Sequence, residues 1–282
     1  MIARVFPRRT AATPTDDLAF IGEPDLFAPK GLAEVHVSVT FTWDLPEAER
    51  IAKVWERHAP VKIGGPATGM RGEDFEPGRY VAPGYTITSR GCPNKCWFCS
   101  VWRRDGGIRE LPVRDGDNIL DDNLLACSDE HVRKVFAMLR RQKKAARFTG
   151  GLEAAKLRPW HVSELASMRI KEMFFAFDTD DDWEPLRGAA KMLREAGFPY
   201  HKLRAYVLIG HPKDTMELAE KRLRDVWSLG IIPMAMLWRG TDGGRDRAWA
   251  KFARAWARPS LVCGKIKAET GRPAGASGPT PT

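Results

Sequence analysis

The sequence predicts an α/β protein: a parallel (β/α)6 partial barrel of the TIM type, with a short N-terminal βαβ extension and a C-terminal helical and disordered tail. Short apolar segments alternate with segments of helical length between residues 84 and 240. Strands that alternate with helices in this way form parallel sheets with right-handed crossovers. The 282 residues are also enough to bury a sizeable core. We divide the chain into residues 1–80, 81–240 and 241–282.

The N-terminal extension is predicted as one strand-helix-strand unit. Val35, Val37 and Val39 alternate with other residues, which is typical of a strand with one buried face. Pro46 lies in the first turn of the next helix, and "VKIGGPATG" predicts a second short strand that ends in a Gly-rich turn. One such unit is too small for a complete doubly wound cofactor domain, so we expect it to extend the barrel sheet.

The barrel elements are predicted from apolar runs and from residues that begin or end helices. Ser128 is expected to cap a helix to residue 139, and Asp214 or Thr215 to cap one to residue 227. Two glycines are expected to end helices, Gly197 and Gly230. The predicted strands are 85–89, 118–121, 146–149, 172–177, 203–209 and 231–237. In such a barrel, chemistry collects at the carboxyl ends of the strands.

Composition indicates a globular protein, with 43% hydrophobic residues, 10 Trp and 13 Phe. The sequence has no apolar run of about 20 residues, the length that a membrane-spanning helix needs. The first residues also lack the apolar stretch of a secretory signal. We therefore expect a cytoplasmic protein with no membrane partner. Thiols stay reduced there, and clustered cysteines more often bind metals than form disulfides.

The net charge of +9 is concentrated in two basic runs. Residues 131–147 hold seven Lys or Arg and no acid, and residues 239–272 hold nine basic and three acidic residues. Such faces are compatible with nucleic acid binding. The alternative is a pair of solvated helix faces, with Trp249, Phe252 and Trp256 of the second run as core anchors of a terminal helix. The Gly- and Pro-rich end of the chain is predicted to be disordered.

Three cysteines directly follow the first predicted strand of the barrel: Cys92, Cys96 and Cys99, spaced C-x3-C-x2-C. Three thiolates in one loop can hold three corners of a 4Fe-4S cluster, which is normally held by four cysteines. One iron then lacks a protein ligand, and an open coordination position is what distinguishes a catalytic metal from a structural one. The alternative is a zinc site in a nucleic-acid-binding protein, with Cys127 or His131 as fourth ligand.

The motif resembles that of the radical S-adenosylmethionine (radical SAM) enzymes. The resemblance includes Phe98, the aromatic residue directly before the last cysteine, and the place of the motif after the first strand of a six-unit barrel. The resemblance implies that Cys92, Cys96 and Cys99 hold a 4Fe-4S cluster to which SAM binds. It further implies an electron donor such as flavodoxin or ferredoxin, and cleavage of SAM to methionine and a 5′-deoxyadenosyl radical that abstracts hydrogen from a substrate. A radical methyl or methylthio transferase is the runner-up. A shared fold does not identify the substrate.

The resemblance also implies SAM contacts, which are assigned position by position. The backbone of Phe98 is expected near the adenine. Where many members have Gly-Gly-Glu for the SAM amino group, this chain has three other polar residues: Asp121, Asp122 and Asn123. A carboxylate or amide oxygen there is able to accept a hydrogen bond from the ammonium, and the sequence leaves open which of the three does so.

Two further strand ends supply candidates by the same resemblance. One strand later, "TGGLE" is similar to the missing motif and gives Gly150, Gly151 and Glu153, with an ordinary strand-to-helix turn as the alternative. After the fourth strand, Asp178 and Thr179 resemble the polar pair that reaches the ribose hydroxyls or the SAM carboxylate. A helix cap is the alternative role for that pair.

The last strand ends carry weaker candidates. Ile209 and Gly210 resemble the apolar-Gly support of the adenine. His211 is a candidate proton donor, and Arg239 is a candidate for holding an anionic substrate group; the alternative for each is an ordinary surface residue. The Gly-Gly-Pro turn is similar to one in cobalamin-binding domains of a radical SAM subclass. Because the chain lacks D-x-H-x-x-G to ligate cobalt, bound cobalamin is the less favoured interpretation.

Overall fold

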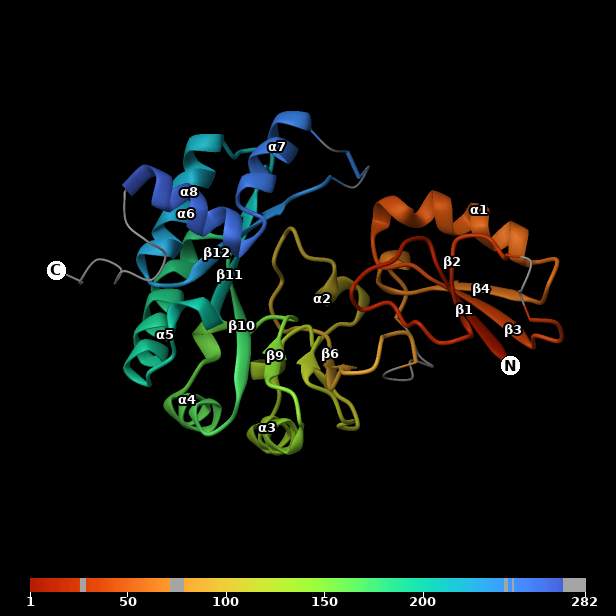
Figure 1. Ribbon diagram of the computed structural model, residues 1–282, viewed down its shortest axis with the longest axis horizontal. Helices are drawn as coiled ribbons and strands as arrows, with labels where there is room; N and C mark the ends of the chain where they lie inside the picture. Colours follow the sequence, from red (N-terminus) through yellow and green to blue (C-terminus); the bar gives the residue numbers. More distant parts are fainter. Residues whose placement is uncertain (26–28, 72–78, 241–242, 245, 271–282) are drawn as a thin grey trace.

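The structure, a computed structural model, describes residues 1–25, 29–71, 79–240, 243–244 and 246–270 (Figure 1). It is a mixed α/β protein with two parallel sheets, one of four strands near the N-terminus and one of six strands in the larger part. Each sheet has its own hydrophobic core. Residues 271–282 of the predicted tail lie outside the described residues.

The larger sheet contains all six strands that the sequence predicts. They are β5 (Tyr85–Thr86), β8 (Asn118–Ile119), β9 (Ala146–Phe148), β10 (Ile170–Phe177), β11 (Leu203–Ile209) and β12 (Ile232–Leu237). Their order is β12-β11-β10-β9-β8-β5, and every neighbouring pair is parallel. Neighbouring strands of this sheet therefore also follow one another in the predicted order along the chain. Because all six strands are parallel, their carboxyl ends lie at one edge of the sheet.

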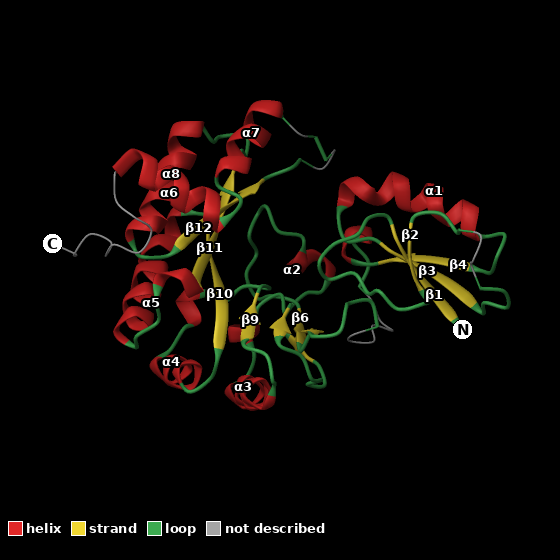
Figure 2. Ribbon diagram, viewed as in Figure 1, coloured by secondary structure: helices red, strands yellow, loops and turns green. Residues whose placement is uncertain are grey.

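Helices connect the strands of the larger sheet and pack against it (Figure 2). They are α3 (Asp129–Arg141), α4 (Pro159–Ala166), α5 (Trp183–Glu195) and α6 (Met216–Ser228), followed by α7 (Arg247–Ala255) and α8 (Pro259–Thr270). Ser128 caps α3 by accepting from His131 N at 3.2 Å. Thr215 caps α6 by accepting from Leu218 N at 3.2 Å, so it is this residue and not Asp214 that fills the predicted role.

The smaller elements lie mostly in the loops. Between β5 and β8 the chain forms β6 (Ser89–Arg90), α2 (Val101–Arg104) and β7 (Arg109–Glu110). Short 3₁₀ segments occur at Thr42–Asp44, Pro66–Thr68, Leu124–Ala126, Ala154–Lys156, Asp180–Asp182 and Tyr200–Lys202. None of the helices in the described part of the chain combines the length and the apolarity that crossing a membrane requires.

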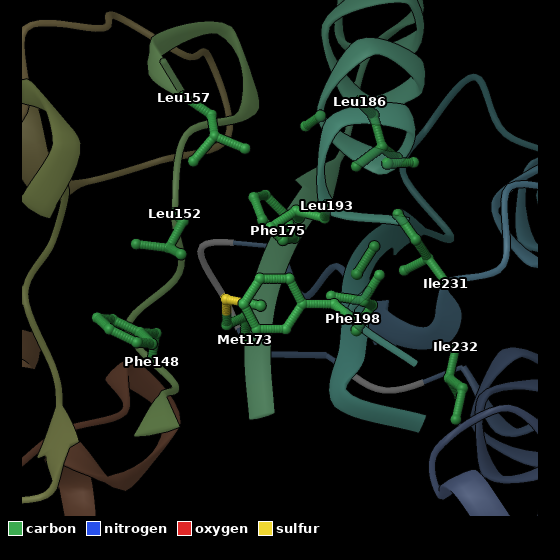
Figure 3. Close-up of a cluster of buried hydrophobic side chains, with 14 of the residues drawn as sticks. Phe148, Leu152, Leu157, Met173, Phe175, Leu186, Leu193, Phe198, Ile231 and Ile232 are labelled. Carbon is green, nitrogen blue, oxygen red and sulfur yellow. The ribbon is translucent and has the colours of Figure 1, made fainter. Parts of the chain in front are cut away.

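The core of the larger part fills the space between the central strands and their helices. Figure 3 shows Met173 and Phe175 of β10 among side chains that include Leu186 and Leu193 of α5. Trp256, which follows α7 and is 1% exposed, belongs to the same core, and Trp249 and Phe252 pack against it. The interpretation of these three aromatic residues as core anchors is therefore confirmed, and burying them fixes α7 and α8 to the sheet.

The N-terminal sheet is larger than the sequence predicts. It contains β1 (Ile2–Phe6), β2 (Ala19–Ile21), β3 (Glu34–Ser38) and β4 (Val61–Gly64) in the order β2-β1-β3-β4, all parallel. Helix α1 (Leu45–Trp55) buries Ile51 and Trp55 in its core. The sequence-based expectation was one unit that extends the barrel sheet; instead, the described N-terminal strands pair only with one another.

The two parts meet where their strands end. Pro66 follows β4, and its carbonyl oxygen accepts from Arg104 Nη1 of α2 at 3.2 Å. Trp43 follows β3, and the guanidinium of Arg239, after β12, lies 3.9 Å from the centroid of its indole ring. Loops at the carboxyl edge of the N-terminal sheet therefore contact loops at the carboxyl edge of the larger sheet.

Candidate functional site

The carboxyl edge of the larger sheet brings together segments that are far apart in the sequence. Since all six strands are parallel, the loops after β5, β8, β9, β10, β11 and β12 lie at this one edge. These loops carry most of the candidate residues named from the sequence; Ile209 is the last residue of β11, and His131 lies in α3. In parallel α/β sheets, ligands bind at this edge.

The cysteines lie in a loop that is closed at its base. Strands β6 and β7 pair antiparallel, and Cys92 N donates to Gly106 O at 3.1 Å. Gly91 has φ of +88°, and a Cβ there would lie 2.1 Å from Gly107 O. Only glycine tolerates this backbone angle together with so close an approach. The base of the cysteine loop, which we define as residues 91–107, therefore depends on Gly91.

All three thiols of the cysteine loop are partly buried. Burial raises the pKa of Cys96 and of Cys99, and negative charge on the neighbouring loop thiols raises both further. This mutual influence indicates that the thiols lie near one another. Among the described residues, no group of three or more His, Cys, Asp or Glu is arranged so as to hold a metal ion. The loop thus gathers the three donors without arranging them in a ligand geometry.

The two residues of the zinc alternative make other contacts. His131 Nε2 lies 3.3 Å from Thr88 Oγ1, and His131 Nδ1 lies 3.7 Å from Glu110 Oε2. The thiol of Cys127 is buried, which raises its pKa to about 11, and a hydrogen bond with Ser89 lowers it in part. These contacts place both residues beside β6 and β7, at the start and end of the cysteine loop.

Asp121 anchors the start of the cysteine loop. Its side chain is 1% exposed and accepts from Thr88 N and Thr88 Oγ1, both at 2.6 Å, and from Ser89 Oγ at 2.8 Å. Burial raises the pKa of this carboxyl, and the hydrogen bonds from Thr88 and Ser89 lower it in part. The contacts made by Asp121 are those of a residue that positions the loop.

Asp122 holds the base of the same loop. Its carboxylate accepts from Gly91 N at 3.0 Å and lies 3.4 Å from Arg90 Nη1 and 3.8 Å from Arg104 Nη2. Burial raises its pKa, and the charge of Arg90 is the largest opposing cause. Arg104, which the sequence did not single out, thus connects Asp122 to Pro66 of the N-terminal part.

Asn123 is the residue of the three that reaches a cysteine. Its Nδ2 donates to Cys92 Sγ at 3.3 Å and to Glu153 Oε2 at 2.6 Å. Its Oδ1 is buried and has no hydrogen-bond partner within the described residues. A buried acceptor of this kind normally has a donor, because leaving it unpaired costs about 1–3 kcal/mol. The oxygen of Asn123 is therefore a buried acceptor for which the described residues supply no donor.

Gly150 allows the ends of β8 and β9 to approach each other. A Cβ on Gly150 would lie 2.3 Å from Asp121 O and 2.8 Å from Asp121 N, so no larger residue fits without moving the backbone. Gly151 has φ of +98°, which turns the chain toward Glu153. The two glycines make a tight strand-to-helix turn, which is the alternative role that the sequence offers for them. The same turn brings Glu153 to Asn123.

Asp178 and Thr179 differ in the contacts that they make. Thr179 N and Oγ1 both donate to Asp182 Oδ2, at 2.8 and 3.2 Å, so this threonine takes part in the cap that the sequence offers as its alternative role. Asp178 Oδ1 accepts from Leu208 N of β11 at 3.0 Å. Burial raises the pKa of Asp178 to about 7, and the charge of Asp182 is the next largest cause.

This raised pKa predicts a pH-dependent stability. Between the unfolded value of 3.8 and the folded value of about 7, the folded chain binds the Asp178 proton and the unfolded chain does not. The contribution of Asp178 to the free energy of unfolding is therefore fully present below pH 3.8 and is lost as pH rises through about 7. Asp178→Asn is expected to raise the free energy of unfolding at pH 8 by about 2–4 kcal/mol and to change little at pH 4.

Urea unfolding at several pH values measures this effect. Asn keeps an oxygen that accepts from Leu208 N, so the variant removes the charge and retains the hydrogen bond. Asp181→Asn, which removes an exposed carboxylate in the same turn, is the matched control and is expected to leave the pH dependence unchanged. Equal slopes for Asp178→Asn and the unmodified chain between pH 4 and 7 would contradict the prediction.

An aromatic group gathers around Trp97 of the cysteine loop. Trp97, between Cys96 and Phe98, is 51% exposed. The centroid of its ring lies 5.4 Å from that of Phe98, 5.7 Å from that of His211 and 6.2 Å from that of Trp238. The sequence-based candidates Phe98 and His211 are thus brought together. Trp97 and Trp238 were not singled out, although each is adjacent in sequence to a named candidate.

The remaining candidates lie in or near the core. Ile209 is fully buried, and Gly210 N donates to Asp214 Oδ2 at 2.8 Å. Arg222 holds the same carboxylate at 2.8 Å. Arg239 stacks on Trp43 of the N-terminal part, which orients its guanidinium toward the contact between the two parts.

None of the family models, curated proteins or solved structures compared with the chain matches it. Its function therefore has to be inferred from the chemistry and placement of its own residues.

Proposed function

We propose that the chain is a radical SAM enzyme of the cytoplasm, in which Cys92, Cys96 and Cys99 hold a 4Fe-4S cluster and SAM binds beside them. The observation that carries this proposal is Asn123, which follows the second strand of the sheet. It donates to Cys92 Sγ, and its own oxygen is left without a partner among the described residues. In this proposal the six-stranded parallel sheet is the partial (β/α)6 barrel of that family.

The chemistry of the three thiols suits such a cluster, although the structure does not arrange them in a ligand geometry. Thiolates are the usual ligands of iron-sulfur clusters, and three of them lie within one loop at the edge of the sheet where ligands bind. Cys92, Cys96 and Cys99 would hold the cluster, and a bound cluster would pass an electron from the external donor to SAM, so that SAM would be cleaved to methionine and a 5′-deoxyadenosyl radical able to take hydrogen from the substrate. A cluster held by three cysteines would leave one iron without a protein ligand, which suits this chemistry better than a closed structural zinc site does.

The residues of the chain orient the reactants. Asn123 Nδ2 is already engaged with Cys92 and Glu153, so Oδ1 is the atom that accepts from the SAM ammonium. Asp121 and Asp122 position the cysteine loop through Thr88, Ser89 and Gly91. His211 stays a candidate proton donor, and Arg239 stays a candidate for holding an anionic substrate group.

Metal analysis and product analysis test this function together. After anaerobic reconstitution with iron and sulfide, the chain is expected to hold about four of each and to absorb as a brown protein. With dithionite and SAM it is expected to form 5′-deoxyadenosine, measured by liquid chromatography and mass spectrometry. One zinc per chain with no 5′-deoxyadenosine would contradict the proposal and support the zinc-stabilised nucleic-acid-binding protein.

A further inference from the structure

The two basic runs of the sequence differ in how their charges are used. In the run 131–147, Arg133 and Arg140 pair with Glu164, Lys134 pairs with Glu130, and Arg147 lies 3.7 Å from Glu172. Four of the seven cations of this run are therefore paired with carboxylates of α3, α4 and β10. The other three, Arg141, Lys143 and Lys144, are exposed without a carboxylate partner among the described residues, and they lie at the end of α3 and in the turn before β9, at the amino edge of the larger sheet and away from the cysteine loop.

The second run presents unbalanced charge on one face of α7. Arg247, Lys251 and Arg254 follow one another at spacings of four and three residues, so they share one face of the helix. All three are exposed, and no carboxylate pairs with any of them in the part of the chain that the structure describes. Asp246, just before the helix, accepts from Trp249 N at 2.9 Å and so caps the helix. We call these three cations the α7 stripe.

Helix α7 is fixed next to the candidate site by its opposite face. Trp249 packs against Gly210 at the end of β11, where a Cβ would lie 3.2 Å from Trp249 Cδ2. The next residue is His211, whose ring contacts that of Trp97 in the cysteine loop. These two contacts, Trp249 with Gly210 and His211 with Trp97, place helix α7 next to the cysteine loop, and the α7 stripe lies on the solvent face of the same helix.

Trp97 adds a stacking surface to this charge. About half of the side chain is exposed, and its edge contacts with Phe98 and His211 hold the ring in one orientation. Proteins that bind single-stranded nucleic acid combine cations that follow the phosphates with exposed aromatic rings on which bases stack. An acidic protein partner would use the charges and would have no need of the exposed indole.

We propose that a single-stranded nucleic acid segment binds along the α7 stripe, with one base stacked on Trp97 beside the cysteine loop. From Arg247 to Arg254 the helix rises about 10 Å, the axial length of about three nucleotides of one strand. This inference deepens the proposed function, on which it rests, by naming a nucleic acid as the substrate class. The binding itself requires neither the cluster nor SAM.

Salt-dependent binding of a fluorescein-labelled oligonucleotide to the full chain, followed by anisotropy, tests the α7 stripe. Each phosphate contact with a single strand contributes about 0.7 to the slope of log affinity against log salt, so three contribute about 2. The triple variant Arg247→Gln, Lys251→Gln, Arg254→Gln is expected to reduce the slope by about 2. The matched control Arg141→Gln, Lys143→Gln, Lys144→Gln removes equal charge from the first run and is expected to leave the slope unchanged.

A second variant tests the stacking surface. Trp97→Ala is expected to lower the affinity by about 10- to 100-fold at fixed salt with the slope unchanged, and Trp97→Phe to restore most of the loss. Tighter binding of RNA or of DNA identifies the sugar, and either result supports the inference. Equal loss in the control triple variant, no effect of Trp97→Ala, or equally tight binding of polyglutamate would overturn it.

The proposed function and the nucleic acid inference can be overturned independently of each other. If the unmodified chain forms 5′-deoxyadenosine from SAM and yet shows no salt-dependent oligonucleotide binding, the substrate inference fails and the proposed function stands. If it binds the oligonucleotide as described and forms no 5′-deoxyadenosine, the proposed function fails instead.

Discussion

Cys96→Ala is expected to abolish 5′-deoxyadenosine formation, because a 4Fe-4S cluster left with two protein ligands is not retained. The same variant is expected to hold much less iron and sulfide after reconstitution than the unmodified chain. Cys96 lies in a loop at the surface edge of the sheet and outside the buried core, so we expect the variant to remain folded. Iron analysis, product analysis and circular dichroism together measure these outcomes.

Cys263→Ala is the matched control for this experiment. Cys263 lies in α8 and packs against the main core, away from the loops that carry the candidate site. The control removes one thiol and is expected to retain iron and activity. Activity that persists in Cys96→Ala, or a loss of equal size in Cys263→Ala, would contradict the role given to the cysteine loop.

Gly150→Ala is expected to lower the free energy of unfolding by about 2–4 kcal/mol. The new Cβ would lie 2.3 Å from Asp121 O and 2.8 Å from Leu120 C, both backbone atoms that cannot rotate away. The ends of β8 and β9 then have to separate, and overpacking of this kind is costly. Because Asp121 also anchors Thr88 and Ser89, we expect the strain to reach the cysteine loop.

Urea unfolding measures this loss of stability, and the control is a glycine-to-alanine variant that is expected to gain stability. Gly188→Ala lies inside α5 at an exposed position, where a Cβ meets nothing within 4 Å. Alanine favours the helix over glycine by about 0.5–1 kcal/mol, so this variant is expected to be more stable than the unmodified chain. A Gly150→Ala chain as stable as the unmodified one would show that the two strand ends separate freely.

The sequence predicted the larger sheet well because its strands are apolar and are separated by strong capping signals. Ser128 and Thr215 accept hydrogen bonds at the predicted helix starts. The N-terminal sheet was predicted poorly. β1 is only five residues long with Arg4 in its middle, and β2 has three residues, so neither has a pattern that stands out from a loop. Their pairing depends on contacts distant in sequence, which periodicity does not report.

For the site, the sequence predicted which strand ends matter but not which atoms act. The run from Asp121 to Asn123 gave three equivalent candidates. The structure distinguishes them, because the two carboxylates accept from loop backbone and hydroxyl groups and only the Asn123 amide reaches both Cys92 and Glu153. Trp97, Trp238 and Arg104 depend on neighbours from other strands, and no spacing along the chain marks them.

The strand order of the larger sheet has a consequence for biosynthesis. Each strand pairs with the one made just before it, so a chain emerging from the ribosome can add strands one at a time. The loop after β5 carries the three thiols, and the residues that fasten this loop, Asp121 to Asn123, are translated only after β8. A nascent chain therefore closes this loop through its own β6–β7 pairing before the contacts from Asp121, Asp122 and Asn123 can form.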